Sequence, residues 1–191
     1  MAEVFDVILS STFSDLEEHR AQVMEACDRL GMTVRVMEHN SADALVVIDK
    51  SYEMVDQGQI YLGVISHRYG SIPNDPVRNP DRLSVTELEY RRAKQFKKPI
   101  LMFVMSDDHP VKRTAVETDP DKFGKLTRLK DEILSPTHPV AVMFDSVADL
   151  REKVVDSLAQ TKLRIERREK NLGNLHSTTA RQIPKPPEPY I

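Results

Sequence analysis

The sequence predicts a single α/β domain, a three-layer sandwich with a mainly parallel five-stranded sheet in the flavodoxin-like order 2-1-3-4-5. Short apolar runs alternate with helical patterns along the chain, which is typical of parallel βαβ units with right-handed crossovers. The 191 residues are enough for one such domain with a proper core and a tail. Polar loops follow the first and third apolar runs, where folds of this kind bind ligands at the switch point.

The expected strands are short runs of aliphatic residues that end in polar or turn-forming residues. Residues 43–57 are expected to form a helix, although Val46, Val47 and Ile48 are β-branched and favour a strand. We expect strands over residues 4–9, 32–37, 59–65, 99–104 and 140–144.

Capping patterns and apolar periodicity locate the helices between these strands. Ser14 and Glu17 have the spacing of a capping box, and Gly31 supplies the stop of the same helix. Ser84 and Glu87 repeat the capping-box spacing further along the chain. We expect helices over residues 14–30, 43–57, 84–97, 122–134 and 146–170.

The final part of the chain has a different composition. The apolar period fades from Asn171, and four prolines lie between Ile183 and Ile191. Such a segment favours a stiff, extended conformation. The sequence therefore predicts a domain over 1–170, including the long final helix, and a Pro-rich linker or disordered tail over 171–191.

Composition excludes several classes of function. The net charge of -3 gives no support to nucleic-acid binding, and no apolar run approaches the ~20 residues that a membrane helix needs. Cys27 is the single cysteine, which favours a reducing, cytoplasmic location, and its place on an apolar helix face predicts a core role. The chain has no P-loop, no G-x-G-x-x-G motif and no metal-ligand spacing among its histidines.

Glu89 is the residue that most suggests chemistry. On a helical wheel it lies with Val85 and Ala93, on the apolar side that should face the sheet, whereas Glu87 falls on the solvated side with Lys94. A carboxylate forced toward an apolar surface has a raised pKa and can act as an acid, a base or an ion stabiliser. A second helix cap with Thr86, or an ion pair with Arg92 or Arg68, would instead make Glu89 structural.

Two loops are candidates for ligand binding. Ser10, Ser11 and Thr12 offer hydroxyl and backbone N–H groups just before a helix, where phosphate or ribose oxygens bind. Arg68 has the geometry to clamp a phosphate, and Tyr69 has the ring to stack on a base or ribose. Ser-rich loops are also ordinary turns and caps, and His-Arg-Tyr-Gly is also an ordinary solvated loop ending in a permissive glycine.

Three segments together resemble an uncharacterised TIR-like domain family. That family is found at the N-terminus of STAND NTPases, in bacterial and some animal proteins that continue into NACHT, TPR or WD40 regions. The resemblance spans about residues 3–145, and the proline-rich end is similar to the linker before the NTPase. The segments, in chain order, are Phe5–Leu16, Ile60–Ser71 and Ser84–Tyr90.

The resemblance implies a function that the residues alone do not. TIR domains share the expected fold, and many hydrolyse NAD with one glutamate on the helix after strand 3. It implies that Glu89 is catalytic, that NAD is the substrate with no bound cofactor or metal, and that the domain self-associates. It also implies that NTPase and sensor domains follow residue 191, in a protein of innate immunity or antiviral defence. The substrate-binding candidates are Ser10, Ser11, Thr12, Phe13, Arg68 and Tyr69.

Two other functions stay open. The domain is alternatively a non-catalytic module that signals through self-association or protein contact, or a sensor that binds a nucleotide without cleaving it. Neither nucleic acid nor a membrane is an expected partner.

Overall fold

A computed structural model describes residues 4–37, 44–136 and 141–180 of the chain. The strands are β1 (Asp6–Ser11), β2 (Thr33–Val36), β3 (Ile60–Ile65), β4 (Ile100–Met105) and β5 (Ala141–Phe144). The helices are α1 (Glu17–Arg29), α2 (Ala44–Gln57), α3 (Val85–Gln95), a short 3-10 turn η1 (Arg113–Ala115), α4 (Pro120–Ile133) and α5 (Val147–Ala180).

The strands form one sheet in the order β2-β1-β3-β4-β5, and each neighbouring pair is parallel. The chain therefore moves outward from β1 to β2 and resumes on the other side of β1 with β3. This reversal makes β1 and β3 the switch point, and Ser10 pairs there with Gly63. The predicted strand order and parallel sheet are confirmed.

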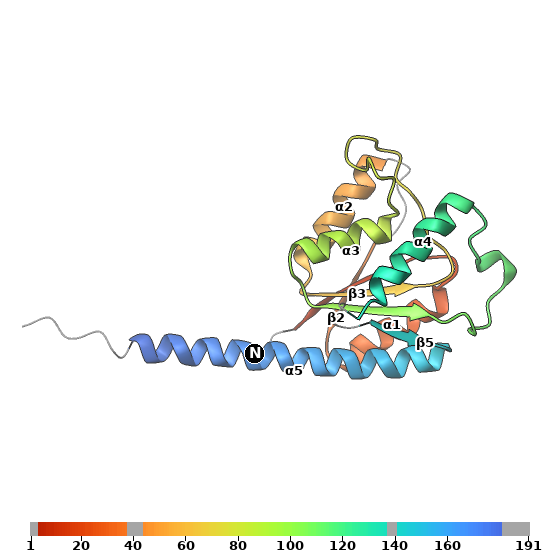
Figure 1. The fold of residues 1–191 in the computed structure, drawn as a ribbon. Coiled ribbons are helices and arrows are strands. Elements are labelled where there is room, and N and C mark those ends of the chain that lie inside the picture. Colours follow the sequence, from red (N-terminus) through yellow and green to blue (C-terminus); the bar gives the residue numbers. More distant parts are fainter. Residues whose placement is uncertain (1–3, 38–43, 137–140, 181–191) are drawn as a thin grey trace, which may run out of the picture.

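Helices cover both faces of the sheet, as Figure 1 shows, with α1 and α5 on one side and α2, α3 and α4 on the other. Apolar side chains of alternate strand positions enter one layer or the other, because successive residues of a strand point to opposite faces. Val7 and Leu9 pack toward α1 and α5, while Ile8 packs toward α2 and α3. Cys27 is fully buried in the first layer, which confirms its predicted core role.

The last helix is longer than expected. α5 continues to Ala180 instead of ending near Lys170, and Figure 1 shows its second half running past the body of the domain. The added residues 171–180 include Gly, Asn, Ser and Thr, which are weak helix formers, so helix propensity does not explain the extension. Residues 181–191 lie outside the described residues, so the linker stays a prediction. No helix in the described ranges is both long and apolar enough to cross a membrane.

The start of α1 also differs from its prediction. Ser14 does not cap the helix, because the chain first makes a turn in which the Leu16 N–H donates to the Phe13 carbonyl over 3.3 Å. α1 then begins at Glu17, with Leu16 as its N-cap residue and no side-chain cap. The fully buried Leu16 anchors this turn, so residues 12–15 remain a loop above the end of β1.

Candidate active site

Two neighbouring serines at the end of β1 face opposite sides of the sheet. Ser10 points toward α3, where its hydroxyl donates to Glu89 Oε2. Ser11 points toward α1, where its Oγ accepts a hydrogen bond from Arg20 Nη1 over 2.8 Å. Since both serines are buried, the strand end carries a carboxyl on one face and a guanidinium on the other.

Glu89 lies in the core layer between α3 and the sheet, as its helical position predicted. Only 3% of the residue is exposed. Burial raises the pKa of the Glu89 carboxyl to about 7, against the weaker opposing effects of the Ser10 hydrogen bond and the Arg20 charge. The ion pair considered for Glu89 is absent, because Arg92 pairs with Asp56 over 2.7 Å. Glu89 is therefore an acid whose charge changes near neutral pH.

Arg20 is a part of this site that sequence reasoning missed. It lies on the buried side of α1, and its guanidinium stacks over the Phe13 ring at 5.4 Å from the ring centre. Burial lowers the pKa of Arg20, while the charge of Glu89 raises it. An arginine in the first turns of an amphipathic helix is usually exposed to solvent, so the sequence pattern did not predict that Arg20 is buried.

A cavity of about 320 Å³ opens beside these residues. It lies at the carboxyl ends of β1 and β3, where parallel α/β sheets bind ligands. Of the predicted binding residues, Ser11, Thr12, Phe13 and Arg68 line it. The other lining residues are Ser14, Asp15, Gly70, Ser71, Val85, Thr86 and Lys122.

Three of the predicted site residues do not line this cavity. Ser10 does not line the cavity, but it is next in sequence to Ser11, which does. Glu89 does not line it either, and it follows the lining residue Thr86 by one turn of α3. Tyr69 is buried, with 2% of its surface exposed, so its ring is not free to stack on a ligand in this conformation. The Glu89 carboxyl is therefore near the cavity in sequence but not exposed to it in this conformation.

The Tyr69 hydroxyl instead fixes the start of α3. It donates to Glu87 Oε2 over 2.6 Å and accepts from the Ser84 backbone N–H over 3.2 Å. Ser84 caps the helix as predicted, because its Oγ accepts from the Glu87 N–H. Glu87 was expected on the solvated face, and this prediction is wrong: it is 1% exposed. A helical wheel of α3 alone does not include Tyr69, whose hydroxyl gives Glu87 a buried hydrogen-bond partner from another segment of the chain.

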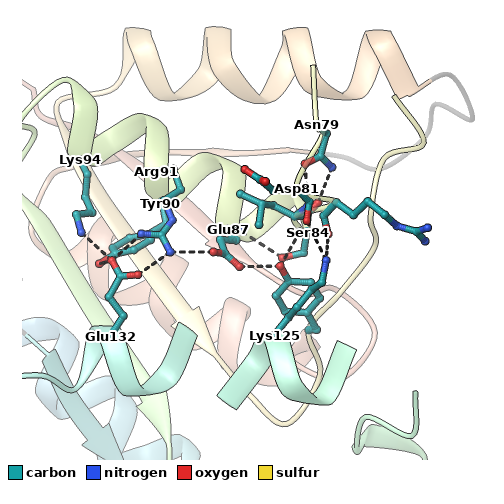
Figure 2. Close-up of polar contacts among 12 residues, drawn as sticks. Asn79, Asp81, Ser84, Glu87, Tyr90, Arg91, Lys94, Lys125 and Glu132 are labelled. Carbon is teal, nitrogen blue, oxygen red and sulfur yellow. Dashed lines mark hydrogen bonds and ion pairs between the residues drawn. The ribbon is translucent and has the colours of Figure 1, made fainter. Parts of the chain in front are cut away.

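A chain of ion pairs continues from this cap along α3 to α4, as Figure 2 shows. Arg91 bonds Glu87 over 2.9 Å and Glu132 over 2.6 Å, and Lys94 bonds Glu132 over 2.7 Å. At the other end of the network, the Lys125 ammonium bonds the Asp81 and Arg82 carbonyls. These contacts hold α3 against α4 and so fix the helix that carries Glu89.

Among the cavity residues that were not predicted, Thr86 and Lys122 offer polar side chains from two different helices. Thr86 lies in the first turn of α3, and Lys122 reaches in from α4, where its ammonium bonds the Gly70 carbonyl over 3.2 Å. Lys122 and Arg68 place two cationic side chains on one cavity, which suits an anionic ligand. Lys122 lies 52 residues after Gly70, so only the fold reveals this pairing.

Comparison with solved structures finds a similar fold in a TIR domain heterodimer. The "Crystal structure of the RPS4 and RRS1 TIR domain heterodimer" matches with a TM-score of 0.50 and 15% identity, over 83% of this chain and 98% of that one. The "Structure of the activated Roq1 resistosome directly recognizing the pathogen effector XopQ (TIR domains)" matches with a TM-score of 0.38 and 12% identity, over 80% and 82%. No curated protein matches the chain.

The family comparison covers nearly the whole α/β domain. The model described as "Domain of unknown function (DUF4062)" matches residues 6–159, from the first residue of β1 into α5. The matched range includes both serines of β1, the cavity loops and Glu89. The chain therefore belongs to the DUF4062 family, a family of unknown function.

Proposed function

We propose that this chain is the TIR-like effector domain of a STAND-type immune protein, and that it cleaves NAD when several copies assemble. The observation that carries the proposal is Glu89, a buried carboxyl with a pKa of about 7 directly behind a cavity at the sheet switch point. A TIR-like fold with this glutamate on the helix after β3 supports NAD as the substrate. In this proposal residues 171–191 connect the domain to the parts that follow.

In the proposed reaction the bond between nicotinamide nitrogen and ribose C1′ breaks, and both bonding electrons leave with nicotinamide. The ionised Glu89 stabilises the positive charge that develops on the ribosyl group. Water then attacks C1′ and releases one proton to solvent, which gives ADP-ribose. In the proposal, Arg68 and Lys122, which line the cavity, bind the phosphates, and the exposed Phe13 ring contacts a base or ribose.

The reaction requires a change at the wall between Glu89 and the cavity. Ser10 holds the carboxyl, and neither Ser10 nor Glu89 lines the cavity, whereas their neighbours Ser11 and Thr86 do. Assembly supplies a plausible cause, because contact with a neighbouring copy can move the loops around residues 12 and 70. The heterodimer formed by the RPS4 and RRS1 TIR domains supports assembly through this fold.

The test is nicotinamide release from NAD by the domain fused to an oligomerising scaffold. Glu89→Gln preserves size and removes the charge, so the rate should fall by about 10²–10³. Glu25→Gln is the matched control, because Glu25 is an exposed residue of α1. A Glu89→Gln protein that releases nicotinamide at the wild-type rate would refute the assignment.

The burial of Glu89 favours a second candidate, a non-catalytic module that signals by self-association. In that case the Ser10–Glu89 contact is a core hydrogen bond, and the cavity binds no substrate. Absence of nicotinamide release in every assembled form, with signalling intact in the full protein and in its Glu89→Gln variant, would support this candidate over the enzyme.

A further inference from the structure

A second and larger cavity, of about 740 Å³, lies on the other side of the loop at residues 12–15. It shares Ser14, Asp15 and Arg68 with the first cavity, but it is walled mainly by the start of α1 and the segment after β4. Its charged wall residues are three acidic ones, Asp15, Glu17 and Glu18, and two cationic ones, Arg68 and Lys112, an excess of one negative charge.

Two histidines meet at the edge of this cavity. His19 of α1 and His109 of the segment after β4 bring their Nε2 atoms to 3.0 Å, and both residues are buried. Phe144 packs against both rings, with ring centres 5.6 and 5.8 Å away. The pair lies 90 residues apart in sequence, so the fold alone creates it.

The hydrogen bonds around the pair define its tautomers. His109 Nδ1 lies 3.2 Å from the Pro110 carbonyl and donates to it, so its Nε2 carries the lone pair. A backbone carbonyl behind Nδ1 is the support that metal-binding histidines usually have. His19 Nε2–H then donates to His109 Nε2. When that proton moves to His19 Nδ1 and both rings turn, two Nε2 lone pairs can point to one metal ion.

We propose that His19 and His109 together bind one divalent transition-metal ion of the Cu²⁺ or Ni²⁺ class. With metal–nitrogen bonds of about 2.0–2.1 Å, a nitrogen separation of 3.0 Å corresponds to an angle of about 90–100° at the metal. This is the angle between neighbouring ligands in square-planar and octahedral sites, which suits Cu²⁺ and Ni²⁺ better than tetrahedral Zn²⁺.

Asp15 supports a cation in the same cavity. Its Oδ2 accepts from the Ser66 hydroxyl, whereas its Oδ1 is buried without a hydrogen-bond partner. An unpaired buried carboxylate oxygen is costly unless a cation or water satisfies it. Within the described ranges no group of three or more histidine, cysteine or acidic side chains is arranged around a metal position. The site thus supplies two imidazoles, with water or the nearby carboxylates in the remaining positions.

The test is titration of the complete chain with NiCl₂ by calorimetry, followed by electron paramagnetic resonance of the Cu²⁺ form. We expect one Ni²⁺ per chain and hyperfine coupling of Cu²⁺ to two imidazole nitrogens. His19→Gln and His109→Gln should each weaken binding at least tenfold. His67→Gln is the matched control, because His67 is near but does not line the cavity and faces Asp107 at 4.0 Å.

Three results would overturn the proposal: no saturable binding by the wild type, binding that survives in both pair variants, or binding that His67→Gln weakens equally. Far-ultraviolet circular dichroism checks that each variant is folded. If one pair variant does not fold, the other variant and the wild-type Cu²⁺ spectrum still decide the question. The proposal does not depend on NAD cleavage, since the readout is metal binding alone.

Discussion

The buried Glu89 carboxyl should make the domain less stable as pH rises toward neutrality, and Glu89→Gln should remove that effect. In the folded state its pKa is about 7, compared with an ordinary value of 4.5. Between these values the unfolded chain has lost the proton and the folded chain keeps it, so folding stability falls with rising pH. Below 4.5 both states are protonated and the full stability is present.

The size of the effect follows from the two pKa values. At about 1.4 kcal/mol for each pH unit, the difference between 4.5 and about 7 corresponds to about 3 kcal/mol. Roughly 2.5 kcal/mol of this falls between pH 5 and pH 8, by the same linkage relation. Glutamine at position 89 does not titrate. From pH 5 to pH 8 the free energy of unfolding should therefore fall by roughly 2.5 kcal/mol less in Glu89→Gln than in the wild type.

Urea unfolding at pH 5, 6, 7 and 8, followed by circular dichroism, measures this difference. Glu132→Gln is the control. Burial alone would raise the pKa of Glu132, but hydrogen bonds and charges from Arg91 and Lys94 lower this pKa to about 2. The stability that Glu132 contributes is present above pH 4.5 and is lost only as pH falls toward 2. Its variant should therefore run parallel to the wild type from pH 5 to 8. Parallel curves for wild type and Glu89→Gln would refute the reasoning.

Three further predictions concern the surroundings of Glu89. Ser10→Ala removes a donor that favours the ionised carboxyl, so the Glu89 pKa measured by carbon-13 NMR should rise above about 7; a lower value would contradict the hydrogen bond. Tyr69→Phe deletes the hydroxyl shared by Glu87 and the Ser84 N–H, and should reduce the free energy of urea unfolding by about 1–3 kcal/mol; an unchanged value would show that the cap does not need it. Gly70→Ala should reduce the free energy of unfolding by about 1–2 kcal/mol, because the backbone φ of +95° disfavours alanine. The added Cβ would also lie 3.1 Å from Thr12 Cγ2, a close contact that increases this cost. Gly31→Ala, at φ +65° with open space around it, should cost less in the same urea titration, and an equal cost would argue against the Thr12 contact.

The sheet was predictable because its signals are local. Each strand is a short aliphatic run, and the period of α3 alone placed Glu89 on the buried side. The same wheel misplaced Glu87, because Tyr69 approaches α3 from another loop and gives that carboxylate a buried partner. Consequently Glu87→Gln would break a buried network and is unsuitable as a control.

The missed features all depend on contacts between distant segments. Arg20 is buried because Ser11 and Phe13 meet it across the first loop. The His19–His109 pair joins α1 to the segment after β4, and no spacing in the sequence brings those rings together. The Ser14 capping pattern failed because the buried Leu16 set the turn before α1. Local patterns therefore predicted the frame, and tertiary contacts determined the chemistry of the site.

The most direct test of the central claim is the pH dependence of nicotinamide release by the assembled domain. If the ionised Glu89 stabilises the ribosyl cation, the wild-type rate should fall on acidification as this carboxyl, whose resting pKa is about 7, takes up a proton. Glu89→Gln should be slower by about 10²–10³ and should lack that acid limb. An acid limb and a rate that are the same in both proteins would contradict the account.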